Sequence, residues 1–448
     1  MPIKKPVTKS KEKVTSSTGN AVKKTPQPIN LVRGMKDILP VDQPVWERMR
    51  DLARSISESY GFGRIDTPML EDTSLFIRGV GKMTDIVEKE LYSFETSGKE
   101  NVALRPEGTA PVIRAYIQHG MFNLPQPVKM YYVGPMFRHD RPQHGRYRQF
   151  QSFGCEVIGD ANAIVDAQLI LMAHLFIKEM GIDAVVHVNS IGTPESRANY
   201  KNALVSYFRT KKSKLSEEDK KRLLKNPMRL LDSKEPGMAE LKTEAPQIVD
   251  WLDEESKTHF MRVLEYLDEL GIPYQMNPHL VRGLDYYTKT VFEIFPNSTD
   301  QEAAQAAIGG GGRFDGLSEL LGGRATPSAG FGIGLDRCFN LIKDQQPEVS
   351  QNVDVFIAQL GDQGRKRALA VFEDLRKGGI KAGEAFSKDA IKAQMEIANR
   401  RHAKFAIIIG QKEVLDGTAV LRDMDSGTQE IVDVRKIVHE LKKKLHKA

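Results

Sequence analysis

The chain has 448 residues, of which 40% are hydrophobic and 28% charged, a composition typical of a globular protein with room for two or three domains. No apolar run approaches the roughly 20 residues that span a bilayer, and no apolar stretch follows the N-terminal lysines. These features exclude a membrane-spanning chain and a secretory leader, so we expect a cytoplasmic protein without membrane partners. The two cysteines, Cys155 and Cys338, lack the spacing of a zinc site, which favours buried free thiols and predicts no metal site.

The net charge of +6 originates in the N-terminal segment 1–29. This segment contains seven lysines, one acidic residue and almost no large apolar side chains, so it cannot bury enough surface to fold. A disordered, solvated tail is the favoured interpretation. The alternative is a flexible basic arm that attracts nucleic acid.

Folded structure is expected from about Asn30. The first predicted helix opens at Pro44 and repeats apolar residues at helical spacing until Gly61. The next segment, RIDTPMLED (64–72), is typical of a strand that Pro68 interrupts.

A second helix and a hairpin follow. Thr109 is the predicted N-cap of this helix, with Pro111 in its first turn and Glu107 on the loop before it. Residues 127–159 are extended, β-branched and aromatic, and their polar stretch 139–146 predicts the loop of an antiparallel hairpin. Alternation places four residues on one face of the returning strand: Phe150, Ser152, Gly154 and Glu156.

The middle of the chain changes character. Residues 193–275 are charge-rich and predict a helical insertion, whose last helix should bury a stripe from Phe260 to Leu270 and stop at Gly271. Strand patterns then return in three segments, which begin at Leu280, Gly309 and Ser328. A polar linker (343–352) precedes alternating strands and helices, the βαβ pattern of a small α/β domain with a mixed sheet.

Three separated segments carry arginines where they could bind phosphate or carboxylate oxygens. They are GPMFRHDRPQHGRYRQF (134–150), LVRGLDYYTKTVFE (280–293) and GFGIGLDR (330–337). An arginine presents a planar, permanently charged fork that binds such anions at two points. The segments resemble motif 2, the histidine-specific signature and motif 3 of histidyl-tRNA synthetases, which are class II aminoacyl-tRNA synthetases. The resemblance extends from about Asn30 to the C-terminus.

The resemblance implies an α+β fold with the antiparallel-sheet catalytic domain of class II synthetases, a helical insertion and a C-terminal α/β anticodon-binding domain. Segment 64–72 resembles motif 1, usually an element of the dimer interface. The implied domains are a basic tail (1–29), the first part of the catalytic core (30–192), the insertion (193–275), the second part of the core (276–346) and the anticodon-binding domain (352–448).

The resemblance also implies an ATP site. Arg138 stands where these enzymes place an arginine on the α-phosphate, and Arg337 where motif 3 contacts the γ-phosphate. Because Arg337 is expected in the first turn of a helix, the helix dipole and free N–H groups there already favour anions. Asp140 takes the position of the adenine-binding acid, usually a glutamate, and Phe150 that of the residue that stacks on adenine.

Histidine recognition is implied for a second group of residues. Glu107 and Thr109 match the positions that bind the α-amino group, and Glu156 and Tyr287 match the pair that binds the imidazole. Arg282 matches the catalytic arginine of this family, which holds the substrate carboxylate; because strand alternation would put it opposite Tyr287, a bend near Gly283 is required. Further residues assigned to this pocket are Ser152 and Tyr286. Ser152 replaces a frequent glutamine, and Phe314 a frequent tyrosine, which removes polar contacts.

The implied function is that of a histidine–tRNA ligase, a homodimer that uses ATP with Mg²⁺ and binds L-histidine and tRNA(His). The motif 2 loop, with Arg141, Gln143, Arg146 and Arg148, resembles the part that meets the tRNA acceptor end. One alternative is a synthetase-like regulatory subunit of histidine biosynthesis, which usually lacks the signature arginine and the anticodon domain. A synthetase for another amino acid is a second alternative, against which RGLDYY (282–287) argues.

Overall fold

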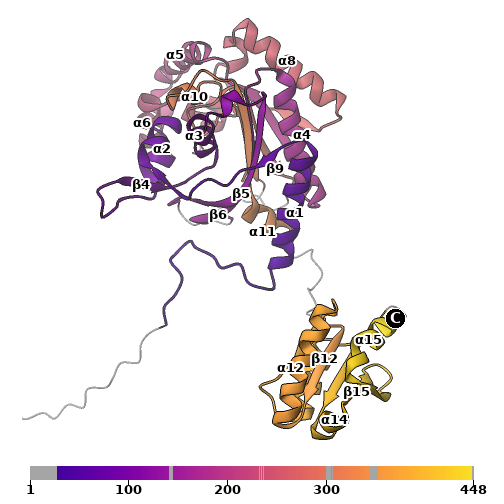
Figure 1. Ribbon diagram of the computed structural model, residues 1–448. Helices are drawn as coiled ribbons and strands as arrows, with labels where there is room; N and C mark the ends of the chain where they lie inside the picture. Colours follow the sequence, from indigo (N-terminus) through magenta and orange to yellow (C-terminus); the bar gives the residue numbers. More distant parts are fainter. Residues whose placement is uncertain are drawn as a thin grey trace, which may run out of the picture. The chain divides into compact units, whose positions relative to one another are not determined.

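The computed structural model describes residues 28–140, 145–231, 233, 235, 237–298, 304, 306–343 and 352–445. These residues form two compact units (Figure 1), the larger containing Val45–Ile342 and the smaller the C-terminal residues from Asn352. Among the described residues, no helix is both long and apolar enough to cross a membrane.

An eight-stranded sheet forms the centre of the larger unit, in the order β1-β5-β6-β11-β10-β9-β7-β8. Its six inner strands pair antiparallel, and only β1 and β8 at the two edges pair parallel with their neighbours. This confirms the predicted antiparallel core. The strands are β1 (Gly63–Arg64), β5 (Val128–Phe137), β6 (Gln149–Ile158), β7 (Ala184–Ser190), β8 (Tyr274–Met276), β9 (Thr288–Pro296), β10 (Gly309–Arg313) and β11 (Ser328–Gly334).

The predicted strand 64–72 is divided around Pro68. Its first part forms β1 in the large sheet, and its second part forms β2 in a separate three-stranded sheet of order β2-β4-β3. A proline lacks the N–H that a continuous ladder needs, which explains the break. The small sheet contains β2 (Leu70–Asp72), β3 (Ser93–Glu95) and β4 (Asn101–Leu104), and α2 (Thr73–Gly79), a π-helical turn (Ile86–Glu90) and α10 (Leu317–Leu320) complete this region.

Helices cover the large sheet through a shared apolar cluster. They are α1 (Gln43–Ser59), α4 (Ala163–Glu179), α8 (Glu254–Glu269) and α11 (Leu335–Ile342). Trp46 of α1, Phe176 of α4 and Val263 of α8 are fully buried in this cluster with side chains of the sheet. The predicted stripe of α8 is confirmed as far as Leu267, but Leu270, the residue after the helix end at Glu269, is 48% exposed.

The insertion shares a second apolar cluster with the catalytic core, in which Tyr200, Leu204 and Phe208 of α5 are buried together with residues of α3 (Thr109–Gln118), β5 and β9. Its helices are α5 (Pro194–Thr210), α6 (Glu217–Lys225) and α7 (Met238–Thr243), with short 3₁₀ turns between them. By contrast, α8 packs against α4 of the catalytic core, although it lies within the predicted insertion 193–275. The insertion boundary stays a prediction.

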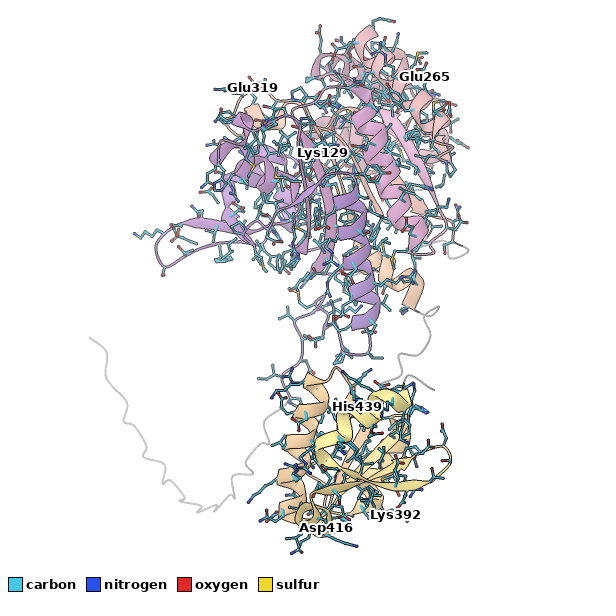
Figure 2. The ribbon with its side chains drawn as sticks, turned by 45° about the vertical axis from the view of Figure 1, so that its right-hand side comes forward. Lys129, Glu265, Glu319, Lys392, Asp416 and His439 are labelled. Carbon is cyan, nitrogen blue, oxygen red and sulfur yellow. The ribbon has the colours of Figure 1, made fainter. Side chains whose placement is uncertain are left out.

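The smaller unit is a five-stranded mixed sheet with helices, as predicted. Strand order is β13-β12-β14-β15-β16, in which β12 pairs parallel with β13 and β14, and the remaining pairs are antiparallel. Its elements are β12 (Val355–Gln359), α12 (Gly361–Lys377), β13 (Ala382–Glu384), α13 (Ile391–Arg400), β14 (Phe405–Ile409), α14 (Gln411–Asp416), β15 (Thr418–Asp423), β16 (Gln429–Asp433) and α15 (Ile437–Leu445). Lys392, Asp416 and His439 lie on three of these helices (Figure 2).

Candidate active site

A cavity of about 720 Å³ lies against the large sheet of the larger unit. It is lined by the ends of β5 and β6, by β10 and β11, by the loop 280–287 and by the first turn of α11. Most of the sequence-predicted site residues line its wall: Glu107, Thr109, Arg138, Asp140, Arg146, Phe150, Ser152, Arg282, Tyr286, Tyr287 and Arg337.

Arg138 and Arg337 reach the cavity from different elements. Arg138 follows the last residue of β5, and its Nε donates to the carbonyl of Pro106 at 2.8 Å. Its guanidinium lies 5.4 Å from the ring centroid of Phe150, across the hairpin. Arg337 lies in the first turn of α11, as predicted, and donates to the carbonyl of Ala307.

Three arginines of this part of the cavity, Arg138, Arg146 and Arg337, lie close enough to affect one another. Burial, together with the charges of Arg146 and Arg138, lowers the pKa of Arg337 to about 10. Arg146 forms an ion pair with Asp140 at 3.1 Å, so Asp140 compensates only part of the charge. A site in which arginines repel one another is suited to a polyanion, because the anion relieves the repulsion.

Arg282 lies in a loop, whereas the sequence predicted a strand from Leu280. The strand β9 begins only at Thr288, and the predicted bend at Gly283 brings Arg282 within 5.4 Å of the Tyr287 ring centroid. Arg282 pairs with Glu293, which the sequence analysis did not single out. Burial lowers the pKa of Arg282, but the carboxylate of Glu293 and the neighbouring Tyr287 and Tyr286 together outweigh burial, so the net shift is upward.

Glu107 caps the helix α3 (Thr109–Gln118) from the loop before it. Its carboxylate accepts from the backbone N–H groups of Thr109 at 2.7 Å and Ala110 at 2.9 Å. Thr109 is therefore the first helical residue and not the N-cap, which contradicts the prediction. The carboxylate performs the capping, so the Thr109 hydroxyl is available for another partner.

Glu156 lies behind the cavity wall. It is fully buried, and its Oε1 accepts from the hydroxyls of Thr109 at 2.8 Å and Tyr132 at 3.2 Å. Its Oε2 has no hydrogen-bond partner within the described part of the chain. Burial raises the pKa of Glu156 well above its usual range. Direct contact between Glu156 and a ligand stays a prediction, and Thr109 and Tyr132 form the surface in front of it.

Tyr132 is a wall residue that the sequence analysis missed. Its ring lies between two glycines, so that a Cβ atom would come within 2.2 Å of it at Gly108 and within 2.3 Å at Gly154. Gly154 pairs with Tyr132 across the hairpin. The glycine on the predicted functional face was the available signal, because a glycine there provides room for a large opposing ring.

Aromatic rings form the part of the wall next to Arg282. Phe314 is 1% exposed, and its ring centroid lies 5.6 Å from that of Tyr286 and 6.4 Å from that of Tyr287. Ser152 lies on β6 and lines the same cavity. Ser152 therefore gives the cavity a short hydroxyl, and Phe314 packs as an apolar ring behind the two tyrosines, at the two positions where the sequence departs from the common family pattern.

Of the four residues predicted to contact tRNA, the structure describes two, and these lie in different places. Arg141 and Gln143 lie outside the described residues. Arg146 lines the cavity. Arg148 instead contacts the residues that precede α1. Its backbone N–H donates to the carbonyl of Gly34 at 2.7 Å, and its Nη1 donates to the carbonyl of Arg33 at 3.1 Å.

Comparisons with known proteins agree with these features. A family model described as "Histidyl-tRNA synthetase" matches residues 34–338, and one described as "Anticodon binding domain" matches residues 354–444. The chain belongs to the histidyl-tRNA synthetase family. A relative from Desulforudis audaxviator, named histidine–tRNA ligase, is 45% identical over 93% of this chain and 99% of its own length. One of the same name from Dehalococcoides mccartyi is 44% identical over 92% and 99%.

Solved structures of the histidyl-tRNA synthetase family share the fold. The apo histidyl-tRNA synthetase of S. aureus is 36% identical, with a TM-score of 0.76 over 93% of this chain and 100% of that chain. A protein from Bacillus halodurans, described as an ATP phosphoribosyltransferase regulatory subunit/histidyl-tRNA synthetase, is 20% identical with a TM-score of 0.61 over 86% and 99%. That second likeness concerns the fold alone. The cavity lies within the part of the chain that the synthetase model matches.

Proposed function

We propose that this protein is a histidine–tRNA ligase. It activates L-histidine with ATP to histidyl-adenylate and pyrophosphate, and then transfers the histidyl group to the terminal adenosine of tRNA(His). The observation that carries the proposal is one cavity that joins an arginine-rich region to a pocket formed by Arg282, Glu107 and two tyrosines. These two halves have the charges that a nucleoside triphosphate and an amino acid require.

ATP would occupy the arginine-rich half. Arg138 binds the α-phosphate, Arg337 the γ-phosphate, and Phe150 stacks on the adenine, with Asp140 at its edge. The cation–π geometry between Arg138 and Phe150 supports this arrangement, because it holds the guanidinium beside the ring that the base would cover. Among the described residues, no group of three or more His, Cys, Asp or Glu side chains is arranged to hold a metal ion. Mg²⁺ would therefore enter with the triphosphate, whose charge it neutralises.

Histidine would occupy the other half. Arg282 holds the substrate carboxylate, and Glu107 with Thr109 the α-amino group. Tyr287, Tyr286, Ser152 and Glu156 surround the imidazole, with Glu156 acting through Tyr132 and Thr109 or directly. One carboxylate oxygen then attacks the α-phosphorus, and the bond to the pyrophosphate oxygen breaks. Catalysis consists of positioning and charge stabilisation without a protein nucleophile.

Membership of the histidyl-tRNA synthetase family also suggests two macromolecular partners, tRNA and a second copy of the chain. Arg141, Gln143 and Arg146 contact the tRNA acceptor end, and the C-terminal unit reads anticodon bases, as proteins that bind single-stranded RNA do. We propose a cytoplasmic homodimer, which sedimentation or light scattering would test. A regulatory subunit of histidine biosynthesis is not favoured, because Arg282 and the C-terminal unit are both present.

Amino-acid-dependent ATP–pyrophosphate exchange tests the proposal. We expect exchange with histidine and none above background with the other standard amino acids, followed by charging of tRNA(His). Absence of histidine-dependent exchange in a folded preparation would reject the ligase assignment, and exchange with another amino acid would reject the histidine pocket.

A further inference from the structure

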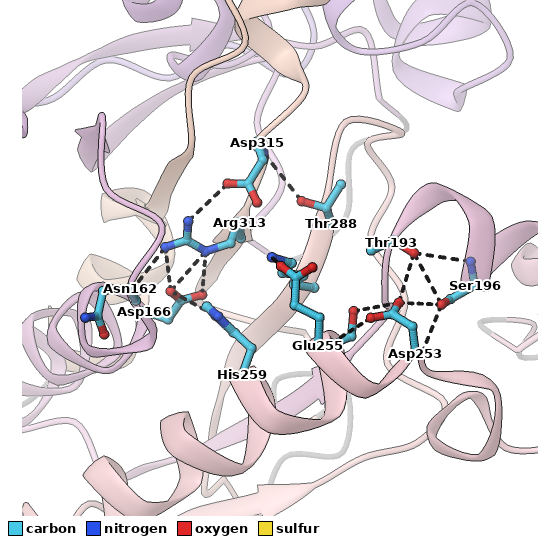
Figure 3. Close-up of polar contacts among 12 residues, drawn as sticks. Asn162, Asp166, Thr193, Ser196, Asp253, Glu255, His259, Thr288, Arg313 and Asp315 are labelled. Carbon is cyan, nitrogen blue, oxygen red and sulfur yellow. Dashed lines mark hydrogen bonds and ion pairs between the residues drawn. The ribbon is translucent and has the colours of Figure 1, made fainter.

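A fully buried arginine lies beneath the amino-acid half of the cavity without lining it. Arg313, at the end of β10, has 0% exposed surface. Its Nη2 donates to Asp166 Oδ2 at 2.8 Å, and its Nη1 to the carbonyl of Asp160 and to Asp315 Oδ1, both at 3.0 Å. His259 of α8 approaches the same Asp166 oxygen from the other side, at an ion-pair distance of 3.4 Å without hydrogen-bond geometry (Figure 3).

Asp315 connects this buried group to three strands. Its Oδ1 accepts from Arg313 and also from the backbone N–H of Ser328, the first residue of β11, at 3.0 Å. The backbone N–H of Asp315 donates to the hydroxyl of Thr288, the first residue of β9, at 3.4 Å (Figure 3). The pairing of β9 with β10 shifts register between Gly312 and Arg313, which interrupts the regular ladder of hydrogen bonds. Beyond this shift, Asp315 links the start of β9 and the start of β11 to the end of β10, and we call this place the strand junction.

Both neighbours of this junction are connected to the tyrosine rings of the cavity wall. Phe314 lies between Arg313 and Asp315 and packs edge-on against the rings of Tyr286 and Tyr287. On the other strand, Thr288 directly follows Tyr287. A displacement of Asp315 would therefore move Phe314 and, with it, the two tyrosine rings of the pocket that Phe314 contacts.

Packing alone does not require an arginine here. Desolvating an arginine and a carboxylate costs several kcal/mol per ion, and well-packed apolar side chains often give equal stability. The charged group instead contributes a fixed geometry, because the planar guanidinium holds its hydrogen-bond partners Asp166, Asp315 and a backbone carbonyl at set angles.

We propose that Arg313, through Asp315, is a positioning residue for the amino-acid pocket and determines its affinity for the substrate's ring. The buried pair with Asp166 anchors Arg313 to α4, and Arg313 in turn holds the strand junction that carries Phe314 and Thr288. This inference rests on the proposed function, because the substrate is taken to be histidine. It assigns no contact with ATP to the network.

Pyrophosphate exchange of the full chain, measured at varied histidine and at varied ATP, tests the inference. A misplacement of about 1 Å in a binding site can cost roughly 100-fold, and a freed junction should move the rings by less. We therefore expect Asp315→Ala to raise the KM for histidine about tenfold while the KM for ATP stays within about twofold. Asp315→Asn keeps the shape and one acceptor oxygen, so it should restore most of the affinity.

His259→Asn is the matched control, because it disturbs the same Asp166 on the side of α8, away from the strand junction. It should lower the melting temperature and leave the KM for histidine unchanged. Should Asp315→Ala fold and show an unchanged KM for histidine, or shift both KM values equally, the inference is wrong. The same holds if His259→Asn raises the KM as much as Asp315→Ala. A wild-type chain without histidine-dependent exchange would instead reject the proposed function. If Asp315→Ala is unfolded, histidine titration calorimetry of Arg313→Lys, which keeps the charge but lacks the planar fork, decides the case. Weaker histidine binding than wild type would support the inference, and equal binding would overturn it.

Discussion

Glu156 is an acid surrounded by neutral hydrogen-bond donors. Its Oε1 accepts from the hydroxyls of Thr109 and Tyr132, and burial raises its pKa. A hydroxyl stabilises a carboxylate less than a cation does, so the pocket holds an acceptor that a ligand's polarised N–H would satisfy better. This environment suits recognition of an imidazole, whether Glu156 binds it directly or through Tyr132.

We predict that Arg282→Ala lowers histidine-dependent pyrophosphate exchange roughly a hundredfold or more, the scale observed when one preorganised charge-stabilising donor is removed. The substrate carboxylate loses its binding partner in both the ground state and the transition state. Glu293→Gln serves as the control, because it removes the negative charge beside Arg282 but keeps the guanidinium. Near wild-type exchange in a folded Arg282→Ala variant would contradict the catalytic assignment.

The raised pKa of Glu156 predicts a pH-dependent stability. The folded protein binds a proton here that the unfolded chain releases above its usual pKa of 4.5, so wild type loses stability as the pH rises from that value through the folded pKa. The neutral amide of the Glu156→Gln variant does not titrate. Melting curves should therefore show this variant gaining stability relative to wild type with increasing pH, and a difference independent of pH would contradict this.

The same variant should also discriminate less well between histidine and amino acids that lack a ring N–H, since a buried acceptor has been replaced by a neutral amide. Exchange assays with histidine and a panel of other amino acids measure this. Unchanged selectivity would mean that Glu156 serves only to position Thr109 and Tyr132.

At the scale of elements, the hairpin of β5 and β6 places its functional residues through glycines. The ring of Tyr132 fits only because Gly154 on the paired strand and Gly108 before α3 have no side chains. Strand alternation alone predicted the face that carries Phe150, Ser152 and Glu156. It could not predict the ring, because the room for it depends on a loop that is distant in sequence.

Gly154→Ala should therefore displace Tyr132, destabilise the chain by about 1–3 kcal/mol, as overpacked cores do, and raise the KM for histidine. Gly316→Ala is the matched control. A Cβ at Gly316 would meet nothing within 4 Å, and its φ of −86° suits alanine. Chemical denaturation and exchange kinetics of the two variants measure the contrast, and equal behaviour would show that Tyr132 is not confined as described.

At the scale of the whole molecule, two units with separate apolar clusters carry different proposed tasks. The cavity is built only from residues of the larger unit. We predict that a chain lacking residues 352–448 still forms histidyl-adenylate at a rate within about threefold of wild type, because its transition-state contacts are intact, but charges tRNA poorly. Exchange and aminoacylation assays separate these steps. Loss of adenylation in a folded truncation would show that the C-terminal unit contributes to the active site.

The sequence predicts this molecule well where the structure depends on local patterns. The antiparallel hairpin, the helix that carries Arg337 and the mixed C-terminal sheet follow from alternation, apolar spacing and turn residues. The errors occur where another group outcompetes the local pattern: the Glu107 carboxylate caps α3 in place of Thr109, and the backbone N–H of Asp285 donates to the distant carbonyl of Val80 instead of joining a strand. Glu293, Tyr132 and Arg313 were missed because each has partners in other strands, helices or loops.

The pairing of β6 has a consequence for how the chain reaches its native state. One edge of β6 is covered by β5, which precedes it in the chain, but the other edge pairs with β11. Ile158 therefore finds its partner Ser328 only after the insertion and the four strands β7 to β10 have been synthesised. Until then, a nascent chain exposes an apolar strand edge, the kind of surface through which partly folded chains aggregate. Folding dominated by such non-local contacts is slow. We therefore expect the yield of native protein to depend on what protects this edge during translation.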